Sequence, residues 1–315
     1  PPYDAGPPPY DAGPPPYDAG PPPYDAGPPP YDAGPPPYDG GPTPDAGFPD
    51  AGFPDAGVTD GGPPPPPTPP VYPGTCPVFT NGNNSNFLSA GQSRSFLMTL
   101  PANPVGAGVV FVWHWLGGNP TDATNWMGYS TAAGTDPVIV IAPNSCCSSG
   151  EWQTGVLPPN NVDIEMFDDV LACLSVQYNV DMNRVWSVGH SAGALFTTFL
   201  MQHRANYLAS VAALSGGQLG GFTVPQSPIP ALLVWGGPTD TYGSFSFETA
   251  TLNLSNNLQN NGHFVVHCSG TFGHQLPPGQ PFTWEFLRDH PRGVQPEPYQ
   301  FGLPPTLPSY CFIPP

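Results

Sequence analysis

The sequence predicts one α/β domain, in which a mostly parallel sheet is covered by helices on both faces, behind a disordered proline-rich tail. Two observations lead to this fold class. Apolar runs typical of buried strands alternate with amphipathic stretches over the last 240 or so residues, which is enough chain for one full core. Of the 52 prolines of the 315-residue chain, 29 lie before residue 76.

A seven-residue repeat dominates residues 1–75. PPYDAGP runs from Pro1 to Pro35, recurs as PPYDGGP, and decays into a run of prolines. Each repeat offers one Tyr and one Ala among prolines, and this is too little apolar surface to offset the cost of ordering the chain. We therefore predict a disordered linker over 1–75, which tethers a folded domain over 76–315 to a cell surface or wall.

The charge of the chain limits its partners. The formal net charge is −18, from 23 acids and five arginines, with no lysine. Such a surface repels phosphate backbones and anionic lipids, so we expect neither nucleic acid nor an electrostatic membrane partner. No apolar run approaches the roughly 18 residues that a bilayer span requires. The charge fits a neutral substrate, and we expect a monomer.

The cysteines indicate an oxidising compartment. All six lie in the predicted domain, at Cys76, Cys146, Cys147, Cys173, Cys268 and Cys311. Zinc binding is the alternative, but no pair has C-x-x-C spacing, so we predict disulfides and no metal. The sequence does not choose among the pairings. The chain begins at Pro rather than Met, which is compatible with removal of a targeting sequence, and we expect a secreted protein.

The elements of the domain follow in order. The predicted strands are RSFLMTL (94–100), AGVVFVW (107–113), PVIVIAP (137–143), RVWSVG (184–189), SVAALSG (210–216), PALLVWGG (230–237) and HFVVHC (263–268). The predicted helices cover 160–181, 191–205, 247–262 and 281–290. In the first helix, Ile164, Phe167 and Val170 recur at spacings of three, with Asn161 or Asp163 as the N-cap.

Residues 189–193, GHSAG, match the pattern G-x-S-x-G between a predicted strand and a predicted helix. A sharp turn there brings the backbone segments so close that only small residues fit two positions before and after Ser191. The hydroxyl then projects above the sheet at a helix N-terminus, where developing negative charge is favoured. The motif predicts Ser191 as a nucleophile.

A serine nucleophile needs a histidine base and a carboxylate that orients it, in the chain order Ser, acid, His. Asp240 follows the strand 230–237, and His274 lies on the loop after the strand 263–268. We predict that Ser191, Asp240 and His274 hydrolyse esters through an acyl-enzyme without a cofactor. His190 is expected to point away from the site, and His203, His263, His267 and His290 to be structural.

The oxyanion of such a reaction needs two backbone N–H donors. Ala192 follows the nucleophile and supplies one. The loop HWLGGN supplies the other, which we assign to Leu116, with Trp115 as the alternative. Trp115, Trp152 and Trp235 fall on or near loops of the same edge and are predicted to bind substrate, with burial in the core as the alternative interpretation.

Arg94 to Arg292 resembles the secreted polyhydroxybutyrate depolymerase and feruloyl/acetyl-xylan esterase group of α/β-hydrolases. The shared blocks are RSFLMTLP, HWLGGN, DDVLACLSVQYNVDMNRVWSVGHSAGA, ALLVWGGPTD, GH near the end and WEFLRDHPR. The family's nucleophile, acid and base fall on Ser191, Asp240 and His274. The resemblance implies an α/β-hydrolase fold and a polyester depolymerase, with a feruloyl or acetyl-xylan esterase as the first alternative.

The chain departs from the family in two places. His114-Trp115 stands where the family has His-Gly, and Gln275-Leu276-Pro277 stands where it has Trp-Pro after the catalytic His. The altered loop and the repeat motivate an alternative of another class, a surface-displayed binding protein that keeps the fold without turnover. The complete set of triad residues favours the enzyme.

Overall fold

The computed structural model describes residues 65–146, 151–277 and 281–315. Most of the predicted linker therefore lies outside the described residues. Tyr72, which the sequence places in the linker, packs against the domain, because its hydroxyl donates to Leu88 O and its ring lies 5.4 Å from that of Phe87. The end of the predicted linker therefore contacts the domain.

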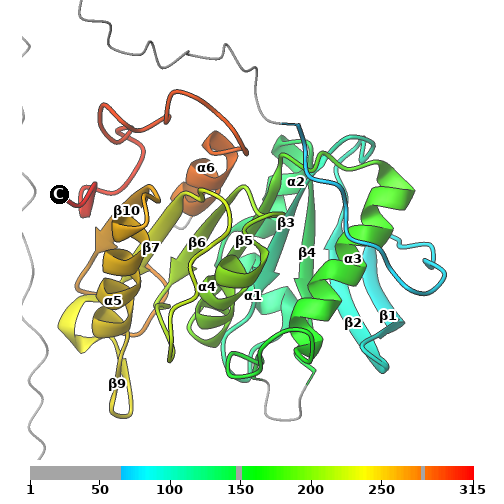
Figure 1. The fold of residues 1–315 in the computed structure, drawn as a ribbon, viewed down its shortest axis with the longest axis horizontal. Helices are drawn as coiled ribbons and strands as arrows, with labels where there is room; N and C mark the ends of the chain where they lie inside the picture. Colours follow the sequence, from blue (N-terminus) through cyan, green and yellow to red (C-terminus); the bar gives the residue numbers. More distant parts are fainter. Residues whose placement is uncertain (1–64, 147–150, 278–280) are drawn as a thin grey trace, which may run out of the picture. The chain divides into compact units, whose positions relative to one another are not determined.

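Among the described residues, nine strands form one sheet in the order β1-β2-β4-β3-β5-β6-β7-β10-β11 (Figure 1). The strands are β1 (Gly82–Ser89), β2 (Gln92–Thr99), β3 (Gly108–Trp113), β4 (Val138–Pro143), β5 (Val185–His190), β6 (Ser210–Leu214), β7 (Ala231–Trp235), β10 (Val265–Ser269) and β11 (Cys311–Phe312). The six strands from β4 to β10 pair in parallel, and β1, β2 and β11 pair antiparallel at the edges. The mostly parallel sheet confirms the predicted fold class.

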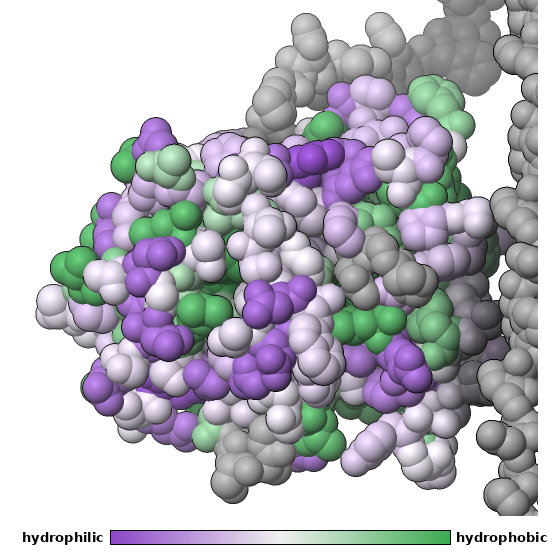
Figure 2. Space-filling model, turned by 180° about the vertical axis from the view of Figure 1, so that it is seen from behind, coloured by the Kyte–Doolittle hydropathy of each residue, from purple (hydrophilic) through white to green (hydrophobic). Residues whose placement is uncertain are grey.

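Helices cover both faces of the sheet. The helices α3 (Val162–Tyr178), α4 (Ala192–Arg204) and α5 (Phe247–Asn260) pack on one face, and they lie in front in Figure 1. The helices α1 (Pro120–Trp126), α2 (Ala132–Thr135) and α6 (Pro281–Asp289) pack on the other. The surface seen from behind mixes hydrophilic and hydrophobic residues (Figure 2). Because each face has its own buried apolar cluster, the central strands are buried on both sides, and β3, β4 and β7 are apolar throughout.

Several elements of the described residues were not identified from the sequence, among them α2 and β11. The edge strand β1, GNNSNFLS, is largely polar and shifts register between Asn84 and Phe87, so it lacks the apolar signal of the central strands. Helix α1 has only seven residues and begins at Pro120, with Asn119 as its N-cap. The hairpin of β8 (Thr241–Tyr242) and β9 (Phe245–Ser246) has strands too short to show alternation.

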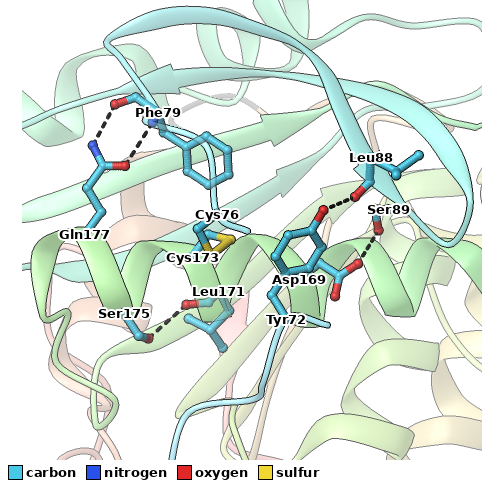
Figure 3. The surroundings of a disulfide bond; sticks show 10 residues. All are labelled: Tyr72, Cys76, Phe79, Leu88, Ser89, Asp169, Leu171, Cys173, Ser175 and Gln177. Atoms are coloured by element: carbon cyan, nitrogen blue, oxygen red, sulfur yellow. Dashed lines mark hydrogen bonds between the residues drawn. A yellow bond between two sulfur atoms is a disulfide. The ribbon is translucent and has the colours of Figure 1, made fainter. Parts of the chain in front are cut away.

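Two disulfides lie within the described residues, as the cysteine count predicted. Cys76–Cys173 joins the segment before β1 to α3, beside Tyr72 and Phe79 (Figure 3). Cys268–Cys311 joins β10 to β11. No described cysteine is free, and Cys147 lies outside the described residues. None of the described helices is long and apolar enough to cross a bilayer.

Candidate active site

Ser191 lies on a tight turn between the end of β5 and the start of α4. Its backbone has φ 55° and ψ −120°, a conformation that L-residues rarely adopt. A Cβ at Gly189 would lie 2.3 Å from the backbone of Gly193, and one at Gly193 would lie 2.1 Å from Trp113 O. Only glycine fits at these two positions, which is the close approach that the sequence argument required.

The three predicted catalytic side chains meet at the carboxyl edge of the sheet. Ser191 Oγ lies 2.9 Å from His274 Nε2, and His274 Nδ1 lies 2.8 Å from Asp240 Oδ1. Because a carboxylate can only accept, Nδ1 carries the proton and Nε2 has a lone pair that faces the serine hydroxyl. The arrangement can therefore remove the proton of Ser191 and hold the resulting imidazolium beside a carboxylate.

Asp240 is fully buried, and its second oxygen is also hydrogen-bonded. Gly236 N donates to Oδ2 at 2.9 Å and Ser215 Oγ donates at 2.8 Å. Ser215 directly follows β6 and has a left-handed backbone conformation, with φ 52°. Sequence reasoning missed this residue, because its role depends on the pairing of β6 with β7, which brings it beside the loop of Asp240.

Two rings hold the imidazole of His274 from both sides. Phe247, at the start of α5, stacks on it at 4.3 Å between ring centroids, and His190 stacks at 5.4 Å. The expectation that His190 points away from the site is therefore wrong. Burial, and secondarily the nearby His274, lower the pKa of His190 to about 3, so this ring is neutral at physiological pH.

The site opens into a cleft of about 780 Å³. Most of its wall is apolar, from the aromatic residues Trp115, Trp126, Tyr242, Phe245 and Phe247 and the leucines Leu116, Leu195, Leu219 and Leu276. Trp115 and Trp126 stack at 5.2 Å, and Trp126 and Tyr242 are 61% and 63% exposed at the mouth. Glu151 is the only carboxylate among the described residues that line the cleft, so its interior suits an uncharged substrate.

Two of the predicted substrate-binding tryptophans do not line the cleft. Trp152 is 5% exposed and packs on Trp113, and its indole N–H donates to His114 O. Trp235 is 3% exposed and donates to Glu248. Both belong to the core: the loop of Trp152 folds inward, and Trp235 is the last residue of the buried strand β7. Of the three, only Trp115 lines the cleft, and Trp126 was missed because α1 was not predicted.

The predicted oxyanion donors lie on the cleft wall beside Ser191. Ala192 is the first residue of α4, where a backbone N–H has no acceptor within the helix. Leu116 lies in a turn closed by the bond from Gly118 N to Trp115 O at 2.9 Å, and Gly117 has φ 68°. The nearby His114 is buried and bonds to Trp115 O, and burial lowers its pKa.

No family model matches the chain. Among curated proteins, it is 21% identical to an oxidized polyvinyl alcohol hydrolase from Sphingopyxis, over 71% of this chain and 83% of that protein. It is 28% identical to feruloyl esterase D from Neurospora crassa, over 50% of this chain and 57% of that protein. A bifunctional acetylxylan esterase/xylanase from Neocallimastix patriciarum is 27% identical over 36% of this chain and 16% of its own length.

Solved structures carry the same fold. Native sOPH superposes with a TM-score of 0.62 at 19% identity and covers 77% of this chain and 95% of its own. Native pOPH has a TM-score of 0.61 at 20% identity, over 76% of this chain and 97% of its own. A carboxylesterase from Bacillus cereus has a TM-score of 0.50 at 16% identity, over 62% of this chain and 93% of its own. The chain therefore has the α/β-hydrolase fold. The comparisons also confirm the resemblance to esterases of this fold that we inferred from the sequence.

Proposed function

We propose that the chain is a secreted serine esterase, which cleaves uncharged carboxylic esters through an acyl-enzyme. The observation that carries the proposal is the hydrogen-bonded series Ser191, His274 and Asp240 at the wall of an apolar cleft. The curated relatives support it, because two of the three are named as esterases.

The order of steps follows from the roles proposed for these residues. Ser191 Oγ attacks the ester carbonyl carbon while His274 Nε2 takes its proton, and Asp240 stabilises the imidazolium. The backbone N–H groups of Leu116 and Ala192 stabilise the oxyanion. His274 then returns the proton to the departing alcohol, and water releases the acid from the acyl-enzyme by the same sequence.

For the substrate we propose a polyester of the polyhydroxyalkanoate type. An open, largely apolar cleft and a strongly acidic chain both favour a neutral polymer over a charged metabolite. The stacked pair Trp115 and Trp126 favours the second candidate, a feruloyl or acetyl-xylan esterase, because a phenolic acyl group can stack on it.

We propose that the protein acts outside the cell. Two disulfides lie within the described part of the chain, and such bonds persist in oxidising compartments. The repeat before the domain then serves as the tether. Removal of residues 1–64 is expected to leave activity on soluble esters unchanged, and a large loss would contradict this role.

The test compares the wild type with Ser191→Ala on p-nitrophenyl acetate and butyrate, methyl ferulate and a suspended polyester. Ser175→Ala on α3, which does not line the cleft, is the matched control. We expect Ser191→Ala to lose all turnover and Ser175→Ala to keep it, with the preferred substrate choosing between the candidates. An inactive wild type that no organophosphonate labels would favour the binding protein instead.

A further inference from the structure

A second cavity, of about 690 Å³, lies at the edge of the sheet opposite to Ser191. Its wall includes Ala209, Pro230 and Phe264, which directly precede β6, β7 and β10. These residues mark the amino ends of the parallel strands, whereas the triad lies at the carboxyl ends. The segment 291–295, which follows α6, closes the cavity.

Arg292 on this wall is a cation without a counter-ion. Its Nη2 donates to Ala205 O and Leu208 O, and its Nε is buried without a partner. The other four arginines each pair with an aspartate, in Arg94–Asp163, Arg184–Asp181, Arg204–Asp168 and Arg288–Asp289. Within the described residues, Arg292 has no carboxylate within 4.0 Å. Burial lowers its pKa, as expected for a desolvated cation.

His263 adds a neutral donor to the same wall. Ile229 N donates to its Nδ1 at 3.2 Å, so the proton of the ring is on Nε2, which is buried without a partner. Burial lowers the pKa of His263, and the ring is therefore neutral at pH 7. An unsatisfied buried donor is destabilising, which is a reason to look for an acceptor that is absent from the chain.

The acid in the cavity wall is already engaged. Glu297 Oε1 lies 2.7 Å from His290 Nε2, and His290 Nδ1 lies 2.6 Å from Phe286 O. Glu297 is therefore already hydrogen-bonded to another side chain. Among the arginines, all of which lie in the described residues, Arg292 is the one without a carboxylate partner there.

We propose that this cavity binds a small carboxylate with a short apolar body. The carboxylate supplies the acceptor oxygens and the negative charge that Arg292 and His263 lack. Pro228, Ile229 and Val294 give the cavity apolar walls for the remainder of the molecule. The acid released by ester hydrolysis has this chemistry, and only this last link rests on the proposed function.

Arginine side-chain NMR on the full-length wild type tests the site. The chain has five arginines, so its spectrum holds five Nε–H signals, and the one that disappears in Arg292→Lys identifies Arg292. Sodium butyrate is expected to shift the Arg292 signal in a saturable way, whereas butyramide, its uncharged analogue, is not. No shift, or an equal shift of the exposed Arg288, would overturn the proposal.

A binding measurement supplies the second test. Enzyme whose active site is blocked by an organophosphonate is titrated with butyrate by calorimetry. We expect Arg292→Gln to weaken the affinity about tenfold or more and Arg288→Gln, which removes the same charge nearby, to leave it within about twofold. Equal affinities in the two variants would refute the site. If Ser191 does not react with the phosphonate, the proposed function fails, while the NMR result still decides on this cavity.

Discussion

Asp240 and Asp169 are both buried carboxylates, but their surroundings differ. Asp240 lies on the loop after β7 and accepts three hydrogen bonds, from an imidazole, a backbone amide and a hydroxyl. Asp169 lies in α3 under the N-terminal segment, where it accepts a single hydrogen bond, from Ser89 Oγ at 2.7 Å (Figure 3). Their exposed fractions are 0% and 3%, so the contrast lies in the donors and not in the depth.

The small number of donors around Asp169 affects the pKa of this acid. Burial raises its pKa to about 6, and the nearby Glu165 and Asp168 raise it further, against the opposing effect of the Ser89 hydrogen bond. A buried carboxylate stays charged only where donors replace the lost water. The chain thus places three hydrogen-bond donors around Asp240, the acid that faces His274. Asp169, which lies beneath the segment that carries Tyr72, has one such donor among the described residues.

The largest expected difference between the two acids is in activity. Asp240→Asn is expected to lower kcat about 10⁴-fold, because an amide no longer holds His274 in the tautomer that accepts the serine proton. Asp169→Asn, the matched control, is expected to leave kcat and KM unchanged. Steady-state hydrolysis of p-nitrophenyl butyrate measures both. Equal losses in the two variants would mean that the effect of Asp240 is on folding rather than on the reaction.

The second prediction concerns the disulfide beside Asp169. Cys76–Cys173 closes a loop of 97 residues, and its replacement by two serines is expected to lower the free energy of unfolding by about 3 to 5 kcal/mol. Activity at 25 °C is expected to persist, because neither cysteine lines the cleft. Urea denaturation measures the free energy of unfolding, and esterase assays measure the activity. A loss of activity in protein that remains folded would show that the two regions are coupled.

The sequence predicted the central fold because that part has a simple physical signal. Strands such as β3 and β4 are buried on both faces and are apolar throughout, and α3 follows the capping Asn161 and buries Ile164, Phe167 and Val170 at intervals of three. The polar edge strand β1 and the short helix α1 carry no such pattern. Their place is determined by neighbours that are distant in the sequence.

Some residues of the candidate site could likewise be predicted from the sequence, and others could not. Ser191, Asp240 and His274 could be predicted from a local motif, the chain order and the strand ends. Ser215 and Phe247 could not, because their roles depend on how β6 and α5 pack against the loop of Asp240 and the ring of His274. The inward fold of the loop at Trp152 is likewise set by tertiary contacts with Trp113 and His114.

Ser215 provides the third prediction, since it is one of the donors that distinguish Asp240. Ser215→Ala is expected to lower kcat about tenfold with KM unchanged, because a charge-assisted hydrogen bond to the orienting carboxylate is lost. Ser89→Ala removes the corresponding donor of Asp169 and is expected to leave kcat unchanged. A rise in KM alone for Ser215→Ala would contradict a positioning role and indicate a distorted cleft.

The last prediction concerns stability, and it has a definite pH dependence. The folded-state pKa of Asp169, about 6, lies above that of an unfolded aspartate, near 4, so the folded state binds more protons between these values. The contribution of Asp169 to stability is therefore greatest below pH 4 and is lost as the pH rises through 6.

The variant Asp169→Asn cannot ionise, so its stability does not fall in this way. We expect it to exceed the wild type in free energy of unfolding by about 1 to 3 kcal/mol at pH 8 and to match it within about 0.5 kcal/mol at pH 4. Urea titrations at the two pH values measure this difference. An advantage that is the same at both would trace the effect to packing instead of to the buried charge.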